Sequence, residues 1–149
     1  MRRRSLCHEF VEFVPDQLHE GVLYISLAYN TAVHKCCCGC GNEVVTPISP
    51  VDWTLGYNGE SITLRPSIGN YSFECRSHYW ITRNRVDWSP VPSLRKIEDD
   101  READRLNRLA YFEAGSQSGS QPPGEGGLPT GPQDTPPWWR RAVRRLLDD

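Results

Sequence analysis

The residues best suited to chemistry in this chain gather in two short segments. The first is His34-Lys-Cys36-Cys37-Cys38-Gly39-Cys40-Gly41, and the second is Cys75-Arg-Ser-His78. Thiolate sulfur and imidazole nitrogen are the ligands that zinc takes in proteins, whereas magnesium and calcium take oxygen. The two segments therefore predict a zinc site to which both contribute.

Disulfide bonds are a poorer interpretation of these cysteines. Four of the six cysteines lie between positions 36 and 40, and a disulfide needs two Cβ atoms about 3.8 Å apart at a set dihedral angle. Met1-Arg-Arg-Arg4 leads into polar sequence without the apolar segment of a secretory signal. We therefore expect a reducing, cytoplasmic setting, where clustered cysteines bind metal or act in catalysis. The other reading is that they are reduced thiols packed as small apolar side chains.

The spacing favours one set of four ligands. Cys38-Gly39-Cys40 is a Cys-x-Cys pair, whose glycine lets the backbone bend so that both sulfurs can approach one ion at about 2.3 Å. A second short pair, Cys75-x-x-His78, can meet the same ion from a turn. The predicted metal ligands are therefore Cys38, Cys40, Cys75 and His78, with His34 and Cys36 in reserve.

An extended backbone would sort the first segment into two faces. Side chains of a strand alternate between faces, so His34, Cys36, Cys38 and Cys40 would share one face. Cys37 would then point away from the metal.

Composition divides the chain into three parts. Residues 114–137 hold half of the twelve glycines and half of the twelve prolines. Such a segment cannot bury enough apolar area to offset its ordering entropy, which is typical of a flexible linker. We expect a zinc-binding, β-rich domain over residues 5–113, a disordered linker over 114–137, and a short helix over 138–149.

The predicted domain is mainly β, in an α+β arrangement. Residues 21–27 form a buried strand by composition, and Asn58-Gly59 favours a two-residue turn that pairs Leu55 with Ile62. Residues 78–81 and 86–88 predict a second hairpin, and residues 94–113 have helical spacing. The fold class is therefore a small antiparallel β domain with a zinc knuckle and one following helix.

The C-terminal segment, residues 138–149, has an amphipathic pattern. Tryptophan and aliphatic residues alternate with arginine pairs at helical spacing, and an isolated helix this short is marginal in water. Its apolar face should therefore need a partner. The alternatives are its own domain, a groove on another protein and an anionic membrane surface.

The overall charge excludes some classes of partner. The net charge is −2, which argues against nucleic acid as the main ligand. The sequence contains no apolar run near the roughly 20 residues of a transmembrane segment.

Several motifs between Gly21 and Trp88 resemble an uncharacterised bacterial family, a numbered domain of unknown function. The resemblance is carried by Gly21-Val-Leu-Tyr24, His34-Lys-Cys36-x-Cys38-Gly-Cys40-Gly41, Pro66-Ser-Ile-Gly-Asn70, Cys75-Arg-Ser-His-Tyr79 and Trp88. Members are often encoded beside prokaryotic ubiquitin-like proteins and their E1-like and E2-like enzymes. The resemblance implies a role in attaching, trimming or removing such a modifier, with the modifier or those enzymes as partners.

One functional hypothesis is a zinc-dependent peptidase that trims the modifier's precursor or releases its conjugates. Hydrolysis would need a metal with an open position, a base for water and donors to the oxyanion. His34 is a candidate ligand or proton shuttle, Glu43 the candidate base, and Ser77 a candidate oxyanion donor. A thiol nucleophile at Cys36 or Cys75 is a weaker variant of the same idea.

The alternative hypothesis is a non-catalytic module that binds the modifier or its ligase. Four protein ligands close a zinc ion to substrate, so the metal would only stabilise a small β domain. His34, Cys36 and Cys37 would then be supporting or incidental groups.

Overall fold

The computed structural model describes residues 1–117, in two units that are treated separately below. The first unit covers Met1–Val91, and the second begins at Pro92. The predicted helix over 138–149 and most of the predicted linker lie outside the described residues.

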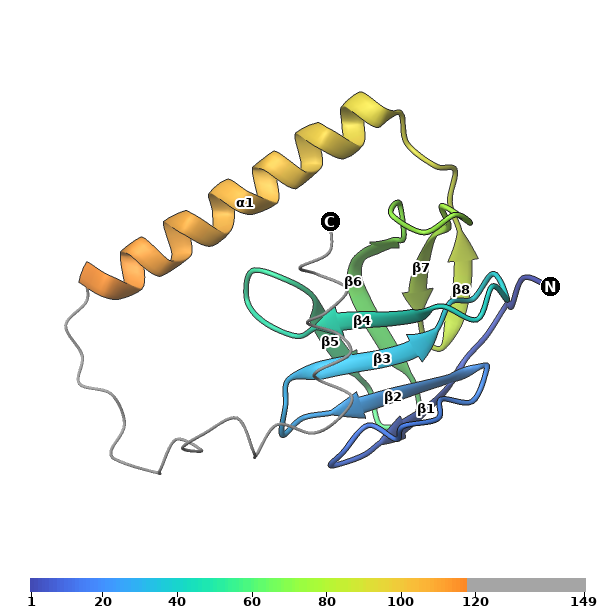
Figure 1. Cartoon of the computed structure of the whole chain (residues 1–149). Helices are drawn as coiled ribbons and strands as arrows, with labels where there is room; N and C mark the ends of the chain where they lie inside the picture. Colours follow the sequence, from blue (N-terminus) through green and yellow to red (C-terminus); the bar gives the residue numbers. More distant parts are fainter. Residues whose placement is uncertain (118–149) are drawn as a thin grey trace. The chain divides into compact units, whose positions relative to one another are not determined.

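The first unit contains two four-stranded sheets (Figure 1). One sheet has the order β1-β2-β3-β4 and the other the order β5-β6-β7-β8. Neighbouring strands of each sheet pair antiparallel, except β1 and β2, which are parallel. The prediction of a mainly β fold is confirmed. The strands are β1 Cys7–Phe10, β2 Val22–Ser26, β3 Thr31–Lys35, β4 Glu43–Pro47, β5 Thr54–Tyr57, β6 Ile62–Gly69, β7 His78–Thr82 and β8 Arg85–Trp88.

Both sheets contribute to one hydrophobic core. Alternate residues of each strand face inward, as the two-residue period of a strand requires, so Leu23 and Ile25 of β2 join Ile62 and Leu64 of β6. The other face of β2 is covered by the segment that precedes it, since Ser26 Oγ donates to the Glu12 carbonyl oxygen at 2.7 Å. The remaining buried members of the core cluster are Leu6, Ala32, Cys36, Cys37, Val44, Ile68, Tyr79, Ile81 and Val86.

The hairpin of β5 and β6 forms where the Asn-Gly signal predicts it, but with another register. Leu55 pairs with Leu64 and not with Ile62, so the predicted pairing is wrong by two residues. The reason is that Asn58 caps a longer turn: its Oδ1 accepts from the backbone N–H groups of Glu60 and Ser61, at 3.0 and 2.8 Å. A shift of two leaves the inward face unchanged.

The second predicted hairpin and the strand at 21–27 are both present. Arg83 and Asn84 connect β7 to β8 with φ of 49° and 63°, which are the positive angles of a type I′ turn.

The described part of the second unit is one helix, α1, over Leu94–Gln117. The sequence predicted its end at residue 113, and the four further residues had been assigned to the linker. Ser116 Oγ donates to the Phe112 carbonyl oxygen at 2.9 Å within this last turn, which extends the hydrogen-bonded helix. No helix within residues 1–117 is long and apolar enough to cross a membrane.

Leu64→Ala should lower the free energy of unfolding by about 2–5 kcal/mol, because Leu64 is fully buried between the sheets. Chemical denaturation would measure the loss. Leu106→Ala is the matched control, since Leu106 is half exposed on α1, and should change stability by about 0.5 kcal/mol or less. Equal effects of the two variants would contradict the assignment of the core.

Candidate functional site

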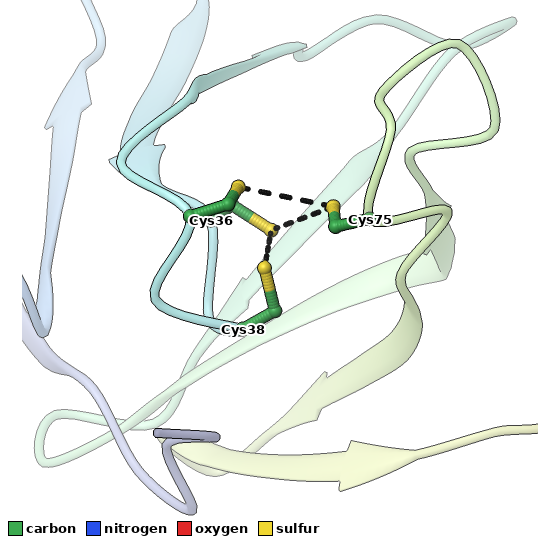
Figure 2. A group of neighbouring side chains, drawn as sticks. Cys36, Cys38 and Cys75 are labelled. Carbon is green, nitrogen blue, oxygen red and sulfur yellow. Dashed lines mark hydrogen bonds between the residues drawn. The ribbon is translucent and has the colours of Figure 1, made fainter.

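Four cysteines from two loops bring their sulfur atoms together. The Sγ atoms of Cys36, Cys38, Cys40 and Cys75 all lie within 4.8 Å of one another. Cys36 and Cys38 face Cys75 across the gap between the loops (Figure 2). The Sγ–Sγ distances from Cys36 are 3.4 Å to Cys38 and 3.9 Å to Cys75, and Cys40 lies 3.8 Å from Cys75. A tetrahedral ion with bonds of about 2.3 Å would separate its sulfur ligands by about 3.8 Å, so the cluster matches the size of such a site.

Tight turns hold the first three of these cysteines. The loop follows β3 and is closed by hydrogen bonds from Cys36 N to the Asn42 carbonyl oxygen and from Gly39 N to the Cys36 carbonyl oxygen, at 2.8 and 3.1 Å. Gly39 and Gly41 have φ of 87° and 80°, angles that residues with a Cβ adopt at a cost. The glycines therefore allow the Cys-x-Cys pair to fold back onto one point.

Cys75 reaches the same point from the loop between β6 and β7. That loop is closed by hydrogen bonds from Asn70 N to the Ser77 carbonyl oxygen and from Arg76 N to the Phe73 carbonyl oxygen, at 2.9 and 3.0 Å. The cluster therefore links a loop of the first sheet to a loop of the second.

The predicted ligand set and the observed cluster differ at one position. Cys38, Cys40 and Cys75 come together as the sequence predicts, but Cys36, which the sequence held in reserve, takes the fourth place. His78 does not join them, because it begins β7 and both of its ring nitrogens have other hydrogen-bond partners. Cys37 is absent from the cluster, as expected, but the extended backbone from which this was predicted is not formed. Strand β3 ends at Lys35 and residues 37–40 lie in a turn, and His34, which was expected on the side of the sulfurs, bonds to Tyr79 instead.

Burial favours the protonated form of two of the clustered thiols, Cys36 and Cys38, when no metal is bound. Desolvation raises the pKa of Cys36 and of Cys38, and it raises the pKa of Cys37 to about 12. Burial acts in the same direction on Cys40, but hydrogen bonds from the Asn42 N–H and the neighbouring cysteines outweigh it and bring its pKa to about 7. A soft cation would be needed to hold all four sulfurs as thiolates.

Buried polar side chains support the cluster from within. The Ser77 hydroxyl lies 3.1 Å from Cys36 Sγ and accepts a hydrogen bond from Asn70 Nδ2 at 2.9 Å. Asn70 Nδ2 also lies 3.4 Å from the hydroxyl of Tyr79, which contacts His34 Nε2 at 2.8 Å. Such hydrogen bonds to ligand sulfurs fix the orientation of a metal site.

The three predicted catalytic residues do not share an accessible site. His34 is fully buried, and burial lowers its pKa to about 4, so it is a neutral core residue. Ser77 is also buried beside the sulfurs. Glu43 begins β4 opposite Lys35, and no carboxylate within residues 1–117 belongs to the sulfur cluster.

A serine and a histidine that the sequence did not combine form a second chemical group. Ser67 Oγ lies 3.0 Å from His78 Nε2, and His78 Nδ1 lies 2.7 Å from the carbonyl oxygen of Pro90. A carbonyl oxygen can only accept, so Nδ1 carries the ring proton and Nε2 is left as an acceptor. The Ser67 hydroxyl therefore donates to Nε2, which is the arrangement of a nucleophile with its general base.

An irregularity in β6 gives Ser67 its position. The register between β6 and β7 shifts between Leu64 and Ile68, and Pro66, inside this bulge, has no backbone N–H to donate to a neighbouring strand. Bulges re-aim side chains and are frequent next to active sites. Ser67 is thereby turned toward His78 on the face of the sheet opposite to the buried Ile68.

Gly69 and Tyr71 complete the surroundings of His78. Gly69 pairs directly with His78, and a Cβ at position 69 would lie 2.4 Å from the ring of Tyr71. The Tyr71 ring in turn packs edge to face against His78, with centroids 5.7 Å apart. Absence of a side chain at Gly69 therefore lets Tyr71 restrain the imidazole.

Comparison with protein families now adds an independent observation. Residues 10–89 match the model of BubE, described as a bacterial ubiquitination-like system serine protease. The chain belongs to the BubE family. The comparisons with curated proteins and with solved structures found no match.

The BubE description agrees with the predicted ubiquitin-like system and protease class, but it differs from the hypothesis on the type of catalyst. It confirms the link to a ubiquitin-like system and to a protease family, and it names serine as the type of catalyst where the sequence had suggested a metal. The matched residues include Ser67, His78 and all four clustered cysteines. The sequence signal for Ser67 is its place in Pro66-Ser-Ile-Gly-Asn70, one of the motifs that carry the family resemblance.

The cysteine cluster predicts different outcomes for two adjacent residues. Cys36→Ser should remove most of the bound metal, because Cys36 is one of the four grouped sulfurs. Cys37→Ala should retain about one metal ion per chain and lose only stability, since its sulfur lies in the core. Metal content of the purified variants would be measured by plasma mass spectrometry. Cys7→Ser, at an exposed cysteine, is the control, and equal metal loss in all three variants would refute the assignment.

Proposed function

We propose that this chain is a serine protease of a bacterial ubiquitin-like modification system, with Ser67 as nucleophile and His78 as general base. The observation that carries the proposal is the Ser67–His78–Pro90 hydrogen-bond chain within a chain of the BubE family. The substrates that we propose are the precursor of the ubiquitin-like modifier and its conjugates. The E1-like and E2-like enzymes of the same system are further candidate partners.

The proposed reaction uses these two side chains in sequence. His78 Nε2 takes the hydroxyl proton as Ser67 Oγ attacks the substrate carbonyl carbon, and the proton then passes to the leaving amine as the peptide bond breaks. A water molecule, deprotonated by the same nitrogen, hydrolyses the acyl-serine and restores the free hydroxyl. The Pro90 carbonyl oxygen accepts from Nδ1 throughout and holds the ring in the required tautomer.

The metal has a structural role in this proposal. Cys36, Cys38, Cys40 and Cys75 would hold a zinc ion, which the thiolate set favours over harder cations. Four protein ligands leave no open position for water, so the ion would supply rigidity and no reacting group. Cys75 lies three residues before His78, so an ion bound here would restrain the loop that leads to the catalytic base.

The main competing function is the non-catalytic module that binds the modifier or its ligase. The closed four-sulfur cluster is compatible with it. The serine–histidine pair on an accessible face of the sheet favours the protease, since a binding module has no need for a histidine held in one tautomer. A cleavage assay distinguishes the two functions.

Ser67→Ala should lower the cleavage rate of a modifier precursor by about 10³-fold or more, because it removes the nucleophile. Metal content and melting temperature should stay unchanged. Ser72→Ala is the matched control, since Ser72 is exposed on the loop after β6, and should retain activity. A fluorophosphonate probe should label the wild-type chain and not Ser67→Ala. Full cleavage by Ser67→Ala would end the assignment, and binding of the precursor without any cleavage by the wild type would decide for the non-catalytic module.

Replacement of the metal should show whether the ion has a structural or a catalytic role. Removal by a chelator should lower the melting temperature and the activity together, because the loops that carry Cys75 and His78 lose their restraint. Restoration with cadmium, which also binds four thiolates, should return the turnover number to within about twofold of the zinc form if the ion only supports the fold. Restored stability without restored turnover would show that the ion takes part in the chemistry.

A further inference from the structure

Strand β6 continues past the end of its neighbour β5. The pairing between the two strands ends at Thr54 with Arg65, whereas β6 extends to Gly69 and still pairs there with β7. Within residues 1–117, no strand pairs with residues 66–69 on the β5 side. This half of β6, including Ser67, is an open sheet edge.

The backbone of Gly69 is directed toward that open side. Asn70 N donates to the Ser77 carbonyl oxygen, so the Asn70 amide faces β7. Backbone groups of successive strand residues point to opposite sides, so the Gly69 N–H and C=O face away from β7. Gly69 and Pro66 are both exposed residues, so this edge of β6 borders solvent.

The outer edge at the far side of this sheet is closed by the chain itself. Val86 N donates to the Arg4 carbonyl oxygen, and Leu6 N donates to the Asn84 carbonyl oxygen, at 2.9 and 2.8 Å. The N-terminal residues thus add to β8, which is how proteins protect an edge from pairing with other chains. The open half of β6 differs, because it is left accessible and contains the proposed nucleophile.

We propose that an extended segment of the substrate, the C-terminal tail of the ubiquitin-like precursor, binds as an added strand along residues 66–69 of β6. Addition of a strand to an open edge gives affinity through main-chain hydrogen bonds. Pairing at Gly69 would place the tail alongside Ser67, two residues away, so one carbonyl of the tail would lie near Oγ. A helical segment cannot pair in this way, so the edge favours a tail that can adopt an extended conformation. This inference rests on the proposed protease function.

Amide hydrogen exchange of the full-length Ser67→Ala variant tests the proposal, with the uncleaved precursor of a ubiquitin-like protein encoded near this chain as the probe. Saturating precursor should slow exchange of the Gly69 amide by about tenfold or more, because the added strand occupies it. The Asn70 amide is the internal control, since it already bonds to Ser77, and should change little. Binding without protection at Gly69, or no binding at all, would overturn the proposal.

Peptides with single N-methyl groups around the cleavage site give a second test, with the wild-type chain. In an added strand every second amide donates to β6, and the amides between them face away. Methylation of an amide that donates to β6 should therefore reduce kcat/KM by about tenfold, and methylation of an amide that faces away should reduce it by less than about twofold. Uniform cleavage of all the peptides would reject strand addition and leave the Ser67–His78 assignment intact. Protection of Gly69 without any cleavage by the wild type would instead reject the protease and retain the binding edge.

Discussion

The mutual approach of four sulfur atoms is the constraint on which the rest of the first unit depends. Two thiolates about 4 Å apart repel by about 4 kcal/mol near a protein surface, and four would do so pairwise. As neutral thiols they make only weak hydrogen bonds. A soft divalent ion bound by the four sulfurs would remove the repulsion and would join the β3–β4 loop to the β6–β7 loop. One small group of atoms can therefore fix the relative position of the two sheets at this end.

The same loop connects the cluster to the serine–histidine pair. Asn70 and Ser77 begin and end the β6–β7 loop, and both contact sulfur or its supporting hydroxyl. Tyr71 and His78 occupy the adjacent positions on the outer face. One side of this loop therefore supports the cysteine cluster, and the other side carries the groups of the proposed chemistry.

Much of the fold follows from local sequence. The strand at 21–27, both hairpins and the start of α1 were predictable, because apolar alternation and turn residues act over a few positions. The register of the β5–β6 hairpin was not, because three hydrogen bonds to the Asn58 side chain decided the turn length. The end of α1 was misplaced because composition cannot distinguish a last helical turn from a linker.

The candidate site was predictable only in part, for a related reason. Spacing predicted that Cys38, Cys40 and Cys75 come together, since short pairs on flexible turns can approach one point in many folds. Cys36 takes the place predicted for His78 in the cluster. This outcome depends on the β6–β7 register, which places His78 opposite Gly69. Ser67 and His78 are far enough apart in sequence that only strand pairing brings them together. Burial of His34 likewise needs both sheets to be in place.

The partner of His78 Nδ1 has an energetic consequence for a protease. Pro90 offers a neutral carbonyl dipole in the place where a carboxylate would carry a full negative charge. A dipole orients the ring, but it stabilises a positively charged imidazolium less than an anion does. If the proposed protease assignment holds, the pair would therefore react slowly with a peptide that is only loosely bound. Cleavage would then depend on a substrate that is held with one bond beside Ser67, and this would limit damage to other proteins.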